Sequence, residues 1–88
     1  MIRFGAPDDM RWVDSALEVR ITVFDGQRDV VCRVSHGWLS ENCGDPAPGA
    51  EAVAAAQAHF VAITDLVSLK IAVGAFEADG SVLLRPTT

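Results

Sequence analysis

The sequence predicts an α+β fold in which a small, mostly antiparallel sheet carries helices on one face. Three observations favour this class. Two alternating apolar runs are joined by Asp25 and Gly26, a shorter alternating run ends the chain, and one long stretch between them has helical periodicity. A chain of 88 residues suits a single domain, 1–88.

The central hairpin is the clearest local pattern. An Asp-Gly dipeptide favours a two-residue type I′ turn, which predicts strands over 16–24 and 27–35 with Phe24 facing Gln27. This register gives one mostly apolar face and one polar face, so the hairpin is expected to cover a core on one side only. The pairs are Leu17 with Val34, Val19 with Cys32, Ile21 with Val30 and Val23 with Arg28 on the first face, and Glu18 with Arg33, Arg20 with Val31 and Thr22 with Asp29 on the second.

Shorter elements flank the hairpin. Residues 2–4 are the candidate for a brief edge strand, and residues 81–85 are predicted as a last strand. The segment 8–15 is expected to be turn-like at both ends. Ser35 is a suitable N-cap for a short helix over 36–43.

The longest element is predicted as one helix over about 50–73, because this stretch lacks proline and is rich in alanine and leucine. Its start stays open between Pro46 and Ala50. At 100° per residue the helix has two apolar stripes. The first consists of Val53, Ala56, Phe60, Ile63, Val67 and Ile71, and the second of Ala55, Ala62, Leu66, Leu69 and Val73, with His59 and Lys70 between them.

The two stripes together span about 200°, roughly twice the arc that a helix on one sheet needs. Something must therefore cover the second stripe. The short helix and the C-terminal segment are the candidates within the chain, and a second copy of the chain is the candidate outside it.

Charge and composition exclude several classes of function. Seven basic residues against twelve acidic ones give a net charge of -5, which disfavours nucleic acid as a partner. No window approaches the ~18 apolar residues of a membrane span, and the N-terminus lacks a signal-peptide pattern, so we expect a cytoplasmic protein with no membrane partner. Glycine-rich phosphate-binding motifs are absent from the sequence, and no cofactor is expected.

Nucleophiles and metal ligands lack the arrangement that their chemistry needs. Cys32 is predicted on the core face of a strand and Cys43 at a helix C-terminus, and both places disfavour a thiolate. Zinc would need these cysteines together with His36 and His59, but no C-x₂-C or H-x₃-H pair exists. The aspartates fit turns and caps. We therefore expect no catalytic residue, no metal site and no enzyme.

Several short segments of the sequence resemble those of a family of small bacterial proteins known as domain of unknown function 1488. They are VRITVFDGQ, CRVS followed by Leu39, Ile63 in the long helix, Lys70 and Ile71 near its end, and EADGSVLLR. The resemblance covers nearly the whole chain. It implies an α+β fold of this size and an uncharacterised cytoplasmic role, and it carries no catalytic residue across. The chain departs from the family at HGW and Cys43, which implies a looser short helix.

The leading functional hypothesis is a non-catalytic interaction or structural module that forms a homodimer through the long helix. The expected interface consists of Ala62, Leu66, Leu69 and Val73, flanked by His59 and Lys70. An unidentified protein is the other partner considered. The alternative hypothesis is a small-ligand-binding or regulatory accessory domain. Its pocket is expected near Trp12, His36 and Trp38.

Overall fold

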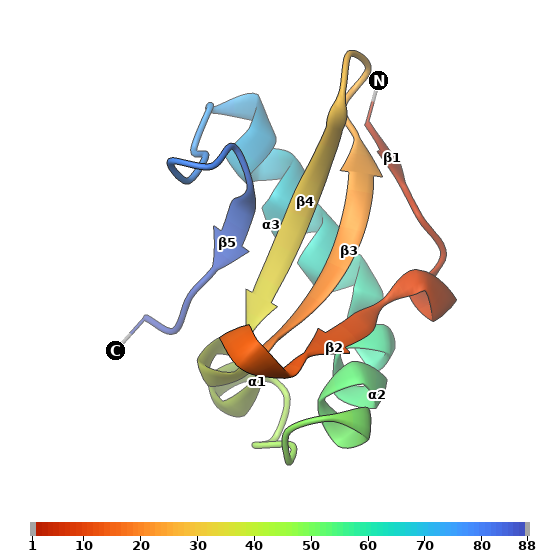
Figure 1. Cartoon of the computed structure of the whole chain (residues 1–88), viewed down its shortest axis with the longest axis vertical. Coiled ribbons are helices and arrows are strands. Elements are labelled where there is room, and N and C mark those ends of the chain that lie inside the picture. The colour runs from red at the N-terminus through yellow and green to blue at the C-terminus, as the bar shows by residue number, and fades with distance from the viewer. Residues whose placement is uncertain (1, 88) are drawn as a thin grey trace.

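A five-stranded mixed sheet with helices on one face forms the structure, a computed structural model that describes residues 2–87. The strands are β1 (Arg3–Phe4), β2 (Arg11–Val13), β3 (Glu18–Phe24), β4 (Asp29–Ser35) and β5 (Val82–Leu84). The order across the sheet is β1-β3-β4-β5, with β2 also paired to β3 (Figure 1). Strand β5 runs parallel to its neighbour β4, and the pairs β1–β3, β2–β3 and β3–β4 are antiparallel. The predicted α+β class is confirmed.

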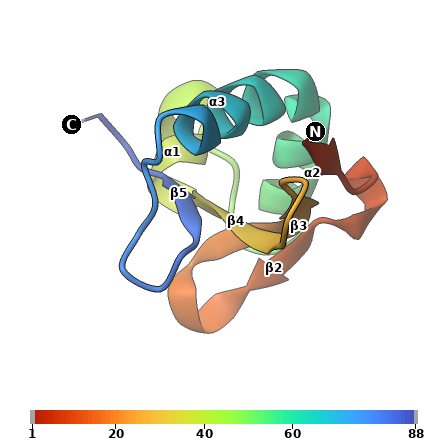
Figure 2. The same ribbon diagram turned by 90° about the horizontal axis from the view of Figure 1, so that it is seen from above.

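The three α-helices of the described residues lie on the same side of the sheet, as seen from above in Figure 2. They are α1 (His36–Asn42), α2 (Ala50–Ala58) and α3 (Phe60–Ala72). The core between the two layers is built from the alternate strand residues that face the helices. The hairpin contributes Val19, Ile21, Val23, Val30, Cys32 and Val34 to it.

The hairpin is present, but its predicted register is wrong by two residues. Phe24 is opposite Asp29, and a four-residue loop replaces the expected two-residue turn. The Asp25 side chain closes this loop, because its Oδ1 accepts hydrogen bonds from the backbone N–H groups of Gln27 and Arg28. Side chains alternate with a period of two, so a slip of two residues leaves each on its predicted face.

The entrance to β3 also differs from the prediction. Leu17 was expected in the strand, on the core face opposite Val34, but it is 54% exposed. A 3₁₀ turn over Asp14–Ala16 precedes it, and Leu17 adopts a left-handed conformation with φ 51°. The strand therefore starts at Glu18, two residues after the predicted start at residue 16.

An additional strand, β2, lies where only turns were expected. The short β1 pairs with the last two residues of β3 and leaves the first half of that edge open. Strand β2 fills this part of the edge, with Trp12 opposite Val19. An open edge would leave backbone N–H and C=O groups of β3 without partners, and β2 supplies these partners. No visible pattern in the sequence indicated this pairing.

The short elements agree well with the prediction. Helix α1 ends at Asn42, one residue before the expected end, and the Ser35 hydroxyl accepts a hydrogen bond from the backbone N–H of Trp38 at 3.1 Å. Strands β1 and β5 fall inside the predicted ranges, each shorter by one or two residues. Helix α2 starts at Ala50, which decides the open question about its beginning.

The single long helix predicted over about 50–73 is wrong, because the chain bends by 78° at His59. Neither proline nor glycine causes the break. Helix α2 packs on β2 and β3, whereas α3 packs on β5 at the other side of the sheet. A single straight helix would not pack on both of these parts of the sheet. The backbone N–H and the Nδ1 atom of His59 both lie within hydrogen-bond distance of the Ala55 carbonyl, which ends α2.

The first apolar stripe forms the core contact of both helices despite the bend. Ala56, Ile63 and Val67 are fully buried, and Val53, Phe60 and Ile71 pack against the core. In the described part of the chain, no single helix is long and apolar enough to cross a membrane. Helices α2 and α3 meet that length and composition only when taken together, across their bend.

Candidate functional site

The second apolar stripe remains uncovered on the outer side of α3. Leu66 is 39% exposed, Leu69 62% and Val73 69%, and Ala62 is exposed as well. Neither α1 nor the C-terminal segment removes these side chains from solvent, although both were candidates to cover them. Four of the predicted interface residues, three in α3 and the C-cap residue Val73, therefore form one continuous exposed surface, which we call the α3 outer face.

The other two predicted interface residues border this face. His59 is exposed at the break between the helices, and Lys70 is half-buried on the flank of α3. Asp65 is exposed on the opposite flank. The bend separates Ala55 from the face, because this residue belongs to α2. A shallow hollow beside the break is lined by Gln57, Ala58, His59, Phe60, Val61, Ala62 and Asp65.

The pocket predicted near Trp12, His36 and Trp38 is only partly assembled. The rings of Trp12 and His36 meet edge to face with centroids 6.1 Å apart. His36 Nε2 lies 2.7 Å from the Pro46 carbonyl oxygen, and the indole N–H of Trp12 donates to Asp14. Trp38 is 7% exposed and belongs to the core. These side chains are engaged within the chain, and a ligand pocket at this place stays a prediction.

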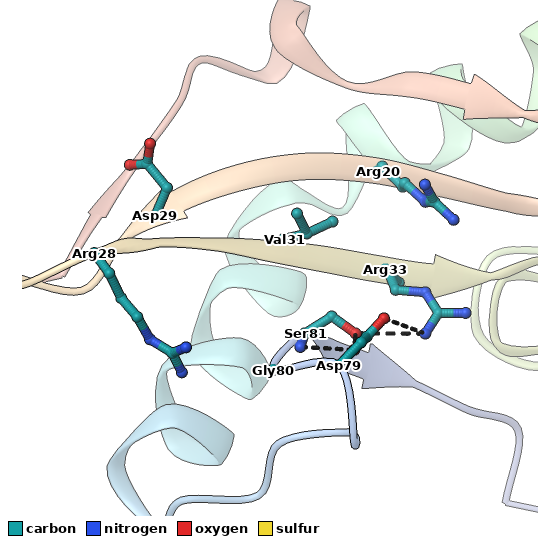
Figure 3. A pocket seen from close by; sticks show the side chains of 8 residues that line it. All are labelled: Arg20, Arg28, Asp29, Val31, Arg33, Asp79, Gly80 and Ser81. Atoms are coloured by element: carbon teal, nitrogen blue, oxygen red, sulfur yellow. Dashed lines mark hydrogen bonds and ion pairs between the residues drawn. The ribbon is translucent and has the colours of Figure 1, made fainter.

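A hollow of about 190 Å³ lies instead on the outer face of the sheet, the face away from the helices (Figure 3). It extends along β4, beside the turn that precedes β5. Its lining is charged at both ends, and the side chain of Val31 forms the middle of its floor. The lining residues are Arg20, Arg28, Asp29, Val31, Arg33, Asp79, Gly80 and Ser81.

Glu18 anchors the charged cluster at one end of this hollow. It is a carboxylate with 2% exposure, and it accepts hydrogen bonds from the Nε atoms of both Arg20 and Arg33. Burial alone raises the pKa of Glu18, but the hydrogen bonds and charges of the two arginines outweigh it and hold the pKa below its usual value. The carboxylate is therefore charged at neutral pH.

The cluster continues to β5. Arg33 Nη1 is 3.4 Å from the Ser81 hydroxyl and 3.9 Å from Asp79 Oδ2. The Ser81 hydroxyl donates to Asp79 Oδ1 at 2.6 Å. The sequence indicated one part of this cluster, since Glu18 and Arg33 were paired on the polar face. The link to Asp79 and Ser81 has no local sequence signal, because it joins residues 46 or more positions apart.

Both thiols are poorly suited to act as nucleophiles. Burial raises the pKa of Cys32 to about 12, and it also raises the pKa of Cys43. Cys32 belongs to the core cluster, as its position on the inward face of the hairpin predicted. Within residues 2–87, no group of three or more His, Cys, Asp or Glu side chains is placed to hold a metal ion.

Fold and surface together define a small α+β domain with a mixed sheet, one helical layer and two open faces. The model of the family described as "Protein of unknown function (DUF1488)" matches residues 2–84, and the chain belongs to this family. No curated protein matches the chain. A crystal structure of a DUF1488 protein of unknown function from Shewanella loihica PV-4 is similar, with 15% sequence identity and a TM-score of 0.85. The match covers 97% of this chain and 92% of that one, and it supports the fold alone.

Proposed function

We propose that the protein is a non-catalytic interaction module that forms a homodimer through the α3 outer face. The observation that carries this proposal is the exposure of Leu66, Leu69 and Val73 on a helix whose opposite side already fills the core. A contiguous exposed apolar patch is typical of an interaction surface. Free thiols at Cys32 and Cys43 fit the reducing cytoplasm as its compartment.

The spacing of the face favours a second copy of the same helix as the occupant. His59, Ala62, Leu66, Leu69 and Val73 follow each other at intervals of three, four, three and four residues. This is the a/d pattern of a heptad repeat, in which two helices pack side by side along one seam. Leu66 and Val73 take a positions, while Ala62 and Leu69 take d positions.

The charges beside the seam favour a parallel pair. In the same heptad Asp65 takes a g position and Lys70 the following e position. Two parallel helices bring a g residue next to the e residue five positions on in the partner. Each Asp65 would then lie beside the partner's Lys70, and the twofold symmetry of the dimer would produce two such ion pairs. An antiparallel pair would instead place like-charged flanks together.

The size of the face indicates a weak dimer. Helix α3 has 13 residues and the heptad pattern covers two repeats. A standard stable interface buries about 1,600 Å², more than one short helix supplies. We therefore expect a concentration-dependent dimer with a dissociation constant of roughly micromolar size.

Light scattering coupled to size exclusion tests the proposal. The wild-type chain is expected to approach twice its 9.4 kDa mass at high micromolar concentration. Leu69→Lys is expected to give the monomer mass with unchanged helix content, because Leu69 projects into solvent within the isolated chain.

Val61→Lys is the matched control. Val61 is an apolar residue of the same helix and is 72% exposed, but its c position lies off the seam. Its substitution is expected to leave the dimer intact. A wild-type monomer at these concentrations, or equal effects of the two substitutions, would reject the proposed interface.

A further inference from the structure

We propose that the outer face of the sheet binds a small phosphorylated metabolite through a row of arginine side chains. Arg11, Arg20 and Arg33 lie directly opposite one another on β2, β3 and β4. Directly opposed residues share one face of a sheet, with their Cβ atoms about 5 Å apart. Three positive groups thus stand side by side in a chain with a net charge of -5.

Such a row is unfavourable without a counter-charge, since like charges on opposed residues destabilise a sheet. Glu18 lies against Arg20 and Arg33 and compensates for one of the three charges. The terminal nitrogens of Arg20 donate no hydrogen bond within residues 2–87, and the side chain of Arg11 has no partner there. These free guanidinium edges match the oxygens of a phosphate group in geometry and charge.

The hollow next to the row has room for the body of the ligand. Val31, 39% exposed, offers an apolar floor, and Arg28 lies at the far end (Figure 3). The Arg28 guanidinium is stacked on the ring of Phe76. The carboxylate of Asp29 has no partner within residues 2–87, and it is free to accept hydrogen bonds from hydroxyl groups. A ligand with a phosphate group at one end and hydroxyl groups at the other is a sugar phosphate.

Two lining residues, Asp29 and Asp79, carry a negative charge that acts against an anion, and Asp79 is the one beside the arginine row. Asp79 lies 3.9 Å from Arg33 and takes up part of its positive charge. Its other oxygen accepts from the backbone N–H and the hydroxyl of Ser81. Neutralising this carboxylate while keeping its shape should therefore strengthen the binding of phosphate, and this gives a test by gain of affinity.

Isothermal titration of the full chain with glucose 6-phosphate, inorganic phosphate and glucose, at constant low ionic strength, tests the proposal. Glucose 6-phosphate is expected to bind more tightly than phosphate, and glucose is expected not to bind. Arg20→Gln should lower the affinity for glucose 6-phosphate about tenfold, which is the effect of losing one charge-assisted hydrogen bond. Asp79→Asn should raise this affinity severalfold. The controls Arg85→Gln and Asp8→Asn make the same charge changes outside the hollow and should leave the affinity unchanged.

Three results would overturn the proposal. The first is the absence of glucose 6-phosphate binding up to about 10 mM. The second is an equal loss of affinity for glucose 6-phosphate in Arg20→Gln and Arg85→Gln. The third is an equal affinity of the wild-type chain for phosphate and glucose 6-phosphate. Arg20 also contacts Glu18, so circular dichroism must show that Arg20→Gln is folded. If it is unfolded, the comparison of Asp79→Asn with Asp8→Asn decides, because equal affinities of these two variants would reject the site.

Discussion

The Glu18 carboxylate lies 2.8 Å from Nε of Arg33, although the two residues are not opposite each other in the sheet. Arg20 occupies the position opposite Arg33. Glu18 lies two residues before Arg20 on the same strand and reaches Arg33 diagonally across to β4. The carboxylate is 2% exposed, whereas the two arginine side chains keep access to solvent. The stability of the hairpin should therefore depend on the charge of this one acid.

Glu18→Gln is expected to lower the free energy of unfolding by about 2 kcal/mol at pH 7, because it leaves two arginines without their shared counter-charge. The pKa of Glu18 is lowered in the folded state, so its contribution is complete above the unfolded value of about 4.5. It is lost as the pH falls through the folded pKa. Urea unfolding of both proteins at pH 7 and pH 3 measures the difference, which should shrink at pH 3.

Asp29→Asn is the control for this prediction. It removes an acid from the same face, but Asp29 is exposed and its carboxylate has no partner among the described residues. Its effect on stability should stay within about 0.5 kcal/mol at both pH values. A Glu18→Gln variant as stable as this control would contradict the assigned role of Glu18.

Leu17→Gly is expected to stabilise the protein by about 0.5–1 kcal/mol. A left-handed conformation costs a branched residue roughly 1–2 kcal/mol, which exceeds the entropy that glycine loses on folding. Little packing is lost, since Leu17 is 54% exposed. Thermal unfolding measures the change. Ala16→Gly, at a neighbouring residue without a positive φ, should lower the melting temperature instead.

Exchanging the charges beside the α3 seam tests the orientation of the proposed dimer. Asp65→Lys should raise the dissociation constant about three- to tenfold, because it places two positive side chains together on each flank. Lys70→Asp alone should weaken the dimer similarly. The double variant should recover the wild-type affinity, as measured by sedimentation equilibrium. Additive losses in the double variant would argue against contact between these residues.

Disulfide cross-linking gives a separate test of a parallel, in-register pair. Leu69→Cys, in a chain that also carries Cys43→Ser, should form a cross-linked dimer on mild oxidation. In a parallel pair each d residue faces its own counterpart, within the short Cα separation that a disulfide requires. The remaining Cys32 is buried and should not compete.

Val61→Cys in the same background is the control and should stay monomeric under denaturing electrophoresis. An antiparallel pair would give a different pattern. It would cross-link a mixture of Leu66→Cys and Leu69→Cys chains, and it would leave Leu69→Cys alone unlinked.

Local signals in the sequence were sufficient for the elements that depend on neighbouring residues. Ser35 predicted the start of α1, because an N-cap acts within one turn of its own helix. The alternation in the hairpin predicted which residues face the core, and a register error of two did not disturb this, because two is the period of a strand. The exposed stripe of α3 followed from helical periodicity in the same way.

The sequence alone determined the α+β class and which faces of its strands and helices are apolar. It also determined the second apolar stripe, which contains Leu66, Leu69 and Val73. Only the tertiary structure decided the bend at His59, the added strand β2 and the link from Arg33 to Asp79. The buried residues before and after His59 keep one helical phase along the chain, so periodicity cannot reveal the bend. The direction in which each helix runs is set by the part of the sheet it must cover, which no local pattern records.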